Sequence, residues 1–428
     1  MTSTDWNGKI MKKMKDSGIE WIGQIPEDWE PTTYRRVFNR RKEYDDKDKQ
    51  VLSLTIQGVK EKNESYGKMA EDFTGHQIVK KNDLVFTPRD FDATPILSGI
   101  APCDGCISNL YFVLYPHDTS KTYIPFYNYF MWGVKWGGDI WRKLSYGMRF
   151  SYNFQQIGAL PTVIPPMDIQ KHIADFLDEK CGKIDRYIEK QQQVIEKLKS
   201  YKQSVITEAV TKGLNPDVPT KDSGIEWIGT IPEHWEIKKL KYATTIMRGK
   251  FSHRPRNDPD YYDGKYPFVQ TGDVARASKY ISTYSQTLNE LGYSVSKEFP
   301  QGSIVMTIAA NVADVAILNF NACFPDSVVG FVPKDIKQMY LFYTLKSMKQ
   351  QLLRNAIIST QLNLNIEIIK EEYIPIPTLE EQEKILSYLD AKCEKIDSAI
   401  NKYNNNCQKL IEYKKSLIYE AVTGKLEV

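Results

Sequence analysis

The sequence predicts an α+β protein made by internal duplication. In it, two mixed α/β domains are separated by a long antiparallel two-helix coiled coil and related by a pseudo-two-fold axis. Residues 15–30 and 221–236 agree at 14 of 16 positions. Residues 177–185 (LDEKCGKID) return as residues 389–397 (LDAKCEKID). The copies lie much further apart than the period of a solenoid, so the repeated unit is a whole domain followed by a helix.

The duplication divides the chain into four expected segments: a first domain at 1–165, a first spacer helix at 166–213, a second domain at 214–374 and a second spacer helix at 375–428. In the first domain, apolar runs between turn residues predict strands at 51–59, 77–87, 96–101 and 109–115. In the second domain they predict strands at 266–271, 302–308, 315–318 and 327–332. Amphipathic helices are expected near 123–136 and 336–354.

The motif GIEWIG-x-IPE-x-W opens each domain. It contains Trp21 and Trp29 in the first copy and Trp227 and Trp235 in the second. We expect these side chains to be packing anchors that seal each domain against a helix, rather than a ligand cage.

Proline and glycine mark the ends of the two spacer helices. Pro165 and Pro166 precede the first helix, and Gly213 follows it. Before the second helix, Thr378 and Glu381 have the spacing of a capping box, in which each side chain satisfies an amide of the first turn. The first helix lacks this signal.

Both helices carry an apolar seam at a 3–4 spacing, which requires a partner helix. The other copy is the simplest partner, and an approximate two-fold axis between the copies makes the pair antiparallel. Lys202 and Lys414 interrupt the two seams at the same step, where they either fix the register or extend their ammonium groups to solvent. The expected seam residues are Cys181, Ile184, Ile188, Ile195, Leu198, Val205, Cys393, Ile396, Ile400, Leu410 and Leu417.

Composition narrows the class of protein. The 428 residues are 41% hydrophobic with a net charge of +3, as in ordinary globular domains. The N-terminal segment MTSTDWNGKIMKKMK lacks the apolar core of a secretory signal, and no apolar run is long enough to span a bilayer. We therefore expect a cytoplasmic protein that does not contact a membrane.

Catalytic and metal-binding patterns are missing from the sequence. We find no phosphate-binding glycine loop followed by Lys-Ser/Thr, no GxSxG and no HExxH, and only five histidines. Cys103 and Cys106 form a single CxxC without two further ligands, so a turn with buried thiols is favoured over zinc or redox chemistry. We therefore expect no catalytic centre, no metal and no cofactor bound by this chain.

The net charge of the chain does not indicate nucleic-acid binding. However, each copy has one local basic cluster, and the two clusters follow the tryptophan motif at similar distances. A single cluster of this kind is more often a solvated loop, whereas its recurrence favours phosphate contact. The clustered residues are Arg35, Arg36, Arg40, Arg41, Arg248, Lys250, Arg254 and Arg256.

Further polar and aromatic side chains lie in predicted loops. Arg, Asn and Gln can hydrogen-bond base edges in the major groove, although for any one of them surface solubility is the commoner role. These candidate DNA-binding residues are Arg89, Arg149, Ser151, Tyr152, Arg276, Lys279, Asn311, Gln361 and Asn363.

The duplicated DSGIEWIG-x-IPE-x-W, the segment PIPTLEEQEKIL before LDAKCEKID, and the final EAVTGKL together resemble the specificity subunit of type I restriction–modification systems. The resemblance extends from about residue 15 to 428. It implies that each domain is a target recognition domain reading one half of a bipartite site in double-stranded DNA. It also implies that the helices set the spacing and bind two DNA methyltransferase subunits.

Further partners implied by the resemblance are restriction subunits that translocate DNA and cut it. S-adenosylmethionine, ATP and Mg²⁺ would be bound by the partner subunits. Because the two domains differ in sequence, the expected target is asymmetric. Two alternatives remain open: a non-enzymatic protein–protein scaffold, and a stand-alone duplicated DNA-binding regulator.

Overall fold

The computed structural model describes residues 13–44, 50–62, 75–89, 97–137, 151–253, 256–354, 356–358 and 362–428. The chain forms two compact units. Unit 1 comprises Met1–Gln192 and Asn404–Val428, and unit 2 comprises Gln193–Tyr403. Each unit contains one domain and a part of both long helices.

Unit 1 is built on a four-stranded antiparallel sheet of order β4-β11-β8-β9. These strands are β4 (Phe38–Arg41), β11 (Phe112–Pro116), β8 (Leu84–Phe86) and β9 (Ser98–Ile100). Three two-stranded sheets flank it: β5 (Leu52–Thr55) with β6 (Gly58–Glu61), β7 (Gln77–Val79) with β10 (Gly105–Ile107), and β3 (Glu30–Thr33) with β12 (Pro161–Ile164). Its short helices are α1 (Tyr34–Val37), α2 (Ile124–Gly137) and α4 (Phe154–Ala159).

Unit 2 contains a five-stranded sheet of order β16-β24-β21-β22-β18 and a four-stranded sheet of order β19-β17-β23-β20. The first comprises β16 (Thr244–Arg248), β24 (Val328–Pro333), β21 (Ile304–Thr307), β22 (Val315–Leu318) and β18 (Tyr280–Ile281). The second comprises β19 (Gln286–Leu288), β17 (Tyr262–Phe268), β23 (Ala322–Cys323) and β20 (Glu298–Phe299).

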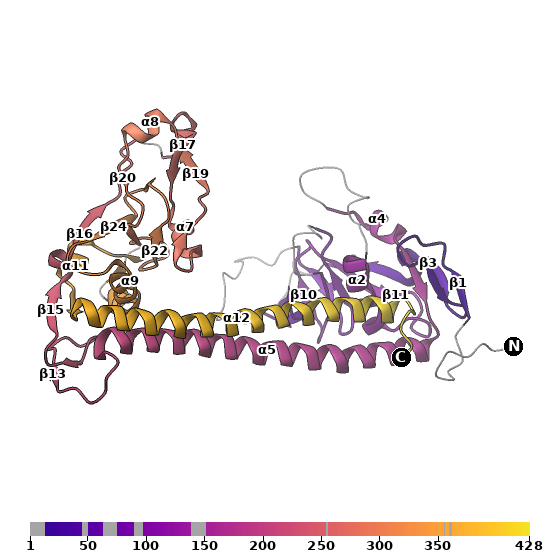
Figure 1. The fold of residues 1–428 in the computed structure, drawn as a ribbon. Coiled ribbons are helices and arrows are strands. Elements are labelled where there is room, and N and C mark those ends of the chain that lie inside the picture. Colours follow the sequence, from indigo (N-terminus) through magenta and orange to yellow (C-terminus); the bar gives the residue numbers. More distant parts are fainter. Residues whose placement is uncertain are drawn as a thin grey trace. The chain divides into compact units, whose positions relative to one another are not determined.

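The remaining strands of unit 2 form the pairs β15 (Glu236–Lys239) with β27 (Tyr373–Ile376) and β25 (Ile357–Ile358) with β26 (Leu362–Asn363). The helices are α6 (Leu240–Ala243), η1 (Pro259–Tyr261), α7 (Thr271–Arg276), α8 (Glu290–Ser294), α9 (Gln338–Ser347), α10 (Lys349–Arg354) and α11 (Ile366–Glu371). Within unit 2, α9 lies near the long helix α12, and α8 lies at the opposite end of the unit (Figure 1).

The repeated tryptophan motif forms the same hairpin in both units: β1 (Met14–Asp16) with β2 (Gln24–Pro26), and β13 (Thr220–Asp222) with β14 (Thr230–Pro232). Two glycines in each turn have φ between 68° and 71°, which side chains with a Cβ rarely adopt, and this explains why the turn is retained so strictly. Trp29 and Trp235 are each 1% exposed, so their expected role as packing anchors is confirmed.

Two helices run through both units: α5 (Met167–Lys212) and α12 (Leu379–Val422). Within unit 1, Lys414 of α12 forms an ion pair with Asp185 of α5, with Nζ–Oδ2 at 2.7 Å. Within unit 2, Lys202 of α5 pairs with Asp397 of α12 at 2.6 Å. From Asp185 to Lys202 the chain advances along α5, while their partners Lys414 and Asp397 run backward along α12. This confirms the predicted antiparallel pairing.

The two ion pairs are equivalent under the duplication, because Asp185 aligns with Asp397 and Lys202 aligns with Lys414 at the same offset. The helices therefore have the same register in both units. Both ammonium groups are held by a carboxylate on the facing helix, so each interrupting lysine contributes to the register. The alternative, an ammonium group extended only to solvent, is wrong.

Burial follows the predicted seam. Seven of its residues are at most 9% exposed: Cys181, Ile188, Ile195, Val205, Cys393, Ile396 and Leu417. The other four are half-buried: Ile184, Leu198, Ile400 and Leu410. Burial raises the pKa of the Cys181 thiol to about 11, so it acts as a small apolar side chain.

Several strand predictions were too long. The expected strand 77–87 is two strands, because Asn82 (φ 69°) makes a turn in which the Asp83 carboxylate accepts from the Lys80 amide at 2.8 Å. The expected strand 51–59 is a hairpin that turns before Gly58 (φ 97°). The expected strand 266–271 ends earlier, because Thr271 begins α7, and the expected helix 336–354 is divided at Met348 into α9 and α10.

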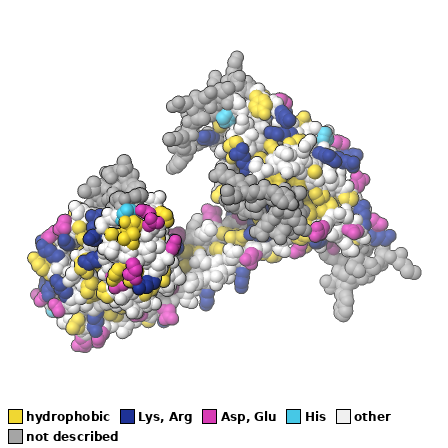
Figure 2. Space-filling view, turned by 90° about the horizontal axis from the view of Figure 1, so that it is seen from above, with side chains coloured by type: hydrophobic (Ala, Val, Ile, Leu, Met, Phe, Trp, Pro, Cys, Tyr) yellow, Lys and Arg dark blue, Asp and Glu magenta, His cyan; other side chains and the backbone are white. Residues whose placement is uncertain are grey.

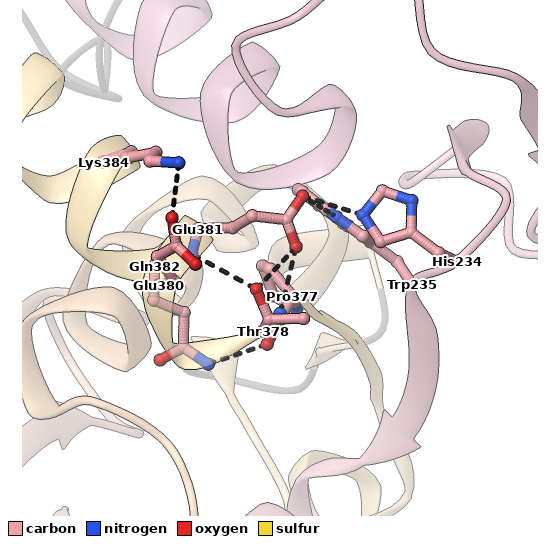
Figure 3. Close-up of polar contacts among 8 residues, drawn as sticks. All are labelled: His234, Trp235, Pro377, Thr378, Glu380, Glu381, Gln382 and Lys384. Carbon is pink, nitrogen blue, oxygen red and sulfur yellow. Dashed lines mark hydrogen bonds and ion pairs between the residues drawn. The ribbon is translucent and has the colours of Figure 1, made fainter.

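The capping box of α12 is confirmed (Figure 3). The Glu381 amide donates to Thr378 Oγ1 at 3.3 Å, and the Thr378 amide donates to Glu381 Oε2 at 3.2 Å. The other oxygen, Oε1, accepts from Trp235 Nε1 at 3.1 Å and contacts His234 Nε2 at 2.8 Å. Burial raises the pKa of Glu381, but these hydrogen bonds outweigh it and leave the pKa lowered.

The first copy lacks this arrangement. Ile169 stands where the second copy has Glu381, and Pro166 stands in place of Thr378. Trp29 Nε1 is buried and has no hydrogen-bond partner among the described residues. The variable residue His234 of the hairpin motif thus contacts the helix start of its own copy through Glu381.

Candidate nucleic-acid interface

The basic cluster of unit 1 is divided between the surface and the interior. Arg35 and Arg36 on α1 are exposed. Arg40 on β4 is half-buried with its guanidinium 4.1 Å from the Phe112 ring centroid, and burial lowers its pKa. Its Nε is buried and has no hydrogen-bond partner among the described residues.

Arg41 corrects the prediction. It is 8% exposed, and its Nε lies 2.8 Å from Asp83 Oδ2. A second contact joins its Nη1 to Glu43 Oε1 at 3.0 Å, and hydrogen bonds to Asp83 raise its pKa. Because the guanidinium neutralises a carboxylate that is itself buried, it is committed to the interior and is unavailable to DNA.

A second group in unit 1 is joined by backbone pairing. Arg89 forms an antiparallel bridge with Ser151, and both residues are exposed. Tyr152 is 3% exposed, in the position of the equally buried Leu364 of the second copy, so its side chain belongs to the core and cannot read bases. Arg149 lies outside the described residues.

The basic cluster of unit 2 gathers around Asp326. Arg248 Nε donates to the Asp326 carbonyl at 2.6 Å, and Arg256 Nη2 contacts both carboxylate oxygens at 2.5 and 2.7 Å. Lys250 is exposed. Arg254 lies outside the described residues.

The remaining predicted residues of unit 2 are dispersed. Arg276 is exposed and pairs with Asp273, and Asn311 is exposed. Lys279 is half-buried, and its ammonium lies 3.0 Å from Asp390 of α12, so it links the domain to the helix. Asn363 lies in β26, and Gln361 lies outside the described residues.

A cavity of about 520 Å³ adjoins this cluster in unit 2. Of the predicted DNA-binding residues, Arg256 is the one that lines it. Its apolar walls are the rings of Phe251, Tyr262 and Phe268. The polar groups that line it are Arg256, Asn257, Gln270, Ser285, Gln286 and Ser327.

The amide groups of this cavity are positioned by the fold. Gln270 Nε2 donates to Gln286 Oε1 at 2.8 Å. The backbone N–H of Gln270 donates to Asp273 Oδ2 at 2.8 Å, and this hydrogen bond fixes the turn at the start of α7. A coupled amide pair beside a guanidinium presents donors and acceptors in the combination that base edges match.

Surface charge agrees with the sequence: Figure 2 shows Lys and Arg side chains interspersed with Asp and Glu. Among the described residues, no cluster of three His, Cys, Asp or Glu side chains could hold a metal ion. Cys103 Sγ lies 3.6 Å from Glu61 Oε1, and Cys106 is buried. Within the described part of the chain, no helix is long and apolar enough to cross a membrane.

Comparisons with known proteins find type I restriction specificity proteins. Residues 232–406 match the family model described as the type I restriction modification DNA specificity domain. The chain is 28% identical over 287 residues to the putative type I restriction enzyme MjaX specificity subunit of Methanocaldococcus jannaschii, covering 65% of this chain and 62% of that protein. It is 31% identical over 172 residues to the MjaIX specificity subunit of the same organism, covering 38% of this chain and 39% of that protein.

The chain thus contains a type I restriction modification DNA specificity domain, and the curated proteins it resembles are named type I restriction enzyme specificity subunits. The matched stretch spans less than two thirds of the length of these curated relatives. A chain from a solved type I R-M system, described for its complex assembly and conformational transition, shares the fold with a TM-score of 0.66. That likeness has 14% sequence identity and covers 94% of this chain and 99% of the other.

Four further polar residues of the unit 2 cavity were not among the predicted site residues: Asn257, Gln270, Ser285 and Gln286. Gln270 and Gln286 stand at the ends of short strands, where they read as ordinary turn residues. The one available signal was the polar run around Gln270-Thr271-Gly272-Asp273, of which the prediction kept only the charged neighbour Arg276. Their convergence depends on the pairing of β17 with β19, which sequence spacing does not reveal.

Proposed function

We propose that this chain is the sequence-specific DNA-binding subunit of a type I restriction–modification complex and is itself non-catalytic. The observation that carries the proposal is one retained frame with two different surfaces. Both units keep the tryptophan hairpin and the Lys–Asp register pair, yet their sheets differ in strand number and order. Such a frame suits two readers of different sequences held in one molecule.

In this proposal, residues 1–165 and 214–374 are target recognition domains, each reading one half of an asymmetric bipartite site. Residues 166–213 and 375–428 are spacer helices that set the gap and dock two methyltransferase subunits. Restriction subunits would join the same complex. S-adenosylmethionine, ATP and Mg²⁺ act in those partners.

Within the second domain, we propose that the cavity beside Arg256 is where bases are read. Glutamine and asparagine pair well with the edge of adenine, and arginine with that of guanine. The exposed residues Arg35, Arg36, Arg248 and Lys250 would contact phosphates, which position the protein without specifying sequence. Asp326 holds Arg256 and competes with DNA for it, so the arginine is presented in one orientation before binding.

Methylome sequencing of cells that carry the complete system tests the proposal. We expect one asymmetric motif in two parts separated by unread bases. A continuous or palindromic motif would contradict it.

The double substitution Gln270→Ala with Gln286→Ala is expected to relax one half of that motif and leave the other unchanged. Gln408→Ala is the matched control, because Gln408 is exposed and hydrogen-bonds along α12, to Glu412. Loss of methylation at both halves together would contradict the proposal that these residues contact bases.

Matched insertions test the spacer role. Seven extra residues in both α5 and α12 keep the seam in phase and lengthen each helix by about 10 Å, or about three base pairs. The unread gap should widen accordingly. An insertion in one helix alone should disrupt pairing, and an unchanged gap after matched insertions would refute the spacer role.

A further inference from the structure

Unit 2 contains a second hollow, on the side of the tryptophan hairpin that meets α5. It is a groove of about 620 Å³ between the C-terminal part of α5, the β13–β14 turn and the helices α9 and α10. Trp227 and Thr207 line it, together with Gln203, Glu208, Ser347 and Gln351.

The duplication supplies an internal reference for this groove. Thr207 aligns with Tyr419 at the same offset as the register pairs. In each helix the residue four positions later is a threonine whose hydroxyl donates to the carbonyl of this position, at 2.7 Å from Thr211 and 2.7 Å from Thr423. The two positions are therefore structurally equivalent, as Trp227 and Trp21 are in the two hairpins.

In unit 1 a tyrosine occupies the equivalent place. The Tyr419 hydroxyl donates to the Trp21 carbonyl at 2.6 Å, and the two rings are 6.3 Å apart. Lys425 donates to the same hydroxyl at 2.8 Å and lies 4.6 Å from the ring centroid. Trp21 also meets Phe130 edge-on at 5.6 Å, so its ring is covered from two sides.

In unit 2 the short side chain of Thr207 leaves this place open. No described residue donates to the Trp227 carbonyl, whose counterpart in unit 1 accepts the tyrosine hydroxyl. The rim is polar: Arg354 and Glu226 form an exposed ion pair at 3.0 Å, and Glu208 and Lys212 lie beside them. An aromatic floor with a free carbonyl acceptor and a rim of both charges fits an aromatic residue within a peptide chain.

We propose that the groove beside Trp227 is a docking site for a tyrosine side chain of a partner protein, which takes the place that Tyr419 fills within unit 1. The ring would stack against Trp227 and its hydroxyl would donate to the Trp227 carbonyl. The volume exceeds that of one ring, so residues next to the tyrosine can lie along the charged rim. This site is separate from the cavity assigned to base reading and does not depend on that assignment.

The test uses the full chain, N-acetyltyrosinamide as the probe and ligand-observed NMR. Thr207→Tyr fills the groove from within, as Tyr419 does in unit 1, and should weaken probe binding at least tenfold. Tyr419→Thr is the mirror variant: it opens the equivalent place in unit 1 and should add a second site. Circular dichroism verifies that each variant is folded, and either variant alone suffices if the other does not fold.

N-acetylphenylalaninamide, which lacks the hydroxyl, should bind at least tenfold more weakly than the tyrosine probe. Equal binding of both probes would overturn the assignment of tyrosine. Undiminished binding to Thr207→Tyr, or an unchanged number of sites in Tyr419→Thr, would overturn the site. Concentration-dependent dimerisation that Thr207→Tyr abolishes would identify a second copy of this chain as the occupant and overturn the partner protein.

Discussion

Replacing Glu381 with isoleucine would give the second copy the residue that the first copy has at the equivalent position, Ile169. The substitution removes four contacts of the carboxylate: those from Trp235 Nε1, from the Thr378 amide, from the Thr378 hydroxyl and from His234. The bond from the residue 381 amide to Thr378 Oγ1 remains. The change therefore isolates what the carboxylate contributes to the junction between hairpin and helix.

The magnitude follows from these contacts. Leaving the indole N–H of Trp235 buried without an acceptor costs about 1–3 kcal/mol. Losing half of the capping box costs roughly 0.5–1 kcal/mol, toward the low end because the carboxylate is 30% exposed. Added apolar burial by isoleucine offsets part of this loss. We expect the substitution to destabilise unit 2 by about 2 kcal/mol in net terms. Urea unfolding followed by far-UV circular dichroism measures the difference.

A double-mutant cycle with Trp235→Phe separates the indole bond from general damage. If the bond carries the effect, the coupling energy should be about 1 kcal/mol or more. Trp29→Phe is the matched control, because Trp29 Nε1 has no described partner and its loss removes only packing. Coupling below about 0.5 kcal/mol, the usual limit of additivity, would refute the reasoning.

Other consequences can be measured on the same protein. The pKa of Glu381 is lowered in the folded protein, so its ionised carboxylate stabilises the fold. This stabilisation should be complete above about pH 4.3, the unfolded pKa, and should vanish as the pH falls through the folded pKa. A destabilisation by Glu381→Ile that persists at low pH would contradict this. Lys202→Asp should destabilise unit 2 and Asp397→Lys should restore it in the double variant, whereas a double variant no better than the single would show that register does not depend on this pair. Arg41→Ala should cost about 3–5 kcal/mol of stability by leaving Asp83 buried and unpaired, and stability unchanged within about 1 kcal/mol would return Arg41 to the DNA surface. Arg35→Ala should leave stability unchanged and reduce the salt dependence of DNA binding by about one ion, as seen in the slope of log affinity against log salt.

The elements that the sequence predicted well are those fixed by local rules. The long helices have proline and glycine at their ends and a sustained 3–4 apolar pattern, and the predicted segments 166–213 and 375–428 contain the observed helices Met167–Lys212 and Leu379–Val422. The antiparallel pairing of the helices was predicted from the duplication, whereas their register comes from the two Lys–Asp pairs. The predicted strands were too long where a short turn interrupts an apolar run. The sequence Lys-Lys-Asn-Asp at 80–83 does not by itself indicate that Asn82 adopts a positive φ.

The candidate DNA site was harder to predict because charge alone does not tell an exposed arginine from a paired one. Arg40 and Arg41 are adjacent, yet the alternation of β4 directs one onto the Phe112 ring and the other toward buried Asp83. The acid is distant in the sequence and reaches the arginine only through pairing of β11 with both β4 and β8. Long-range strand pairing of this kind lies beyond pattern reading.

The duplicated copy supplies the comparison that a single domain lacks. Where the copies agree, as at the two Lys–Asp pairs, the residues are explained by a structural requirement that both units share, namely the register of α5 and α12. Where they differ, the consequence can be traced to a specific atom: Ile169 in place of Glu381 removes the acceptor for Trp29, and Thr207 in place of Tyr419 uncovers Trp227. Divergence in the interior is thus of two kinds: at Ile169 it leaves the Trp29 indole N–H without an acceptor among the described residues, and at Thr207 it leaves a groove open to a partner. Thr207→Tyr tests the second kind, because an open groove should accept the tyrosine without loss of stability.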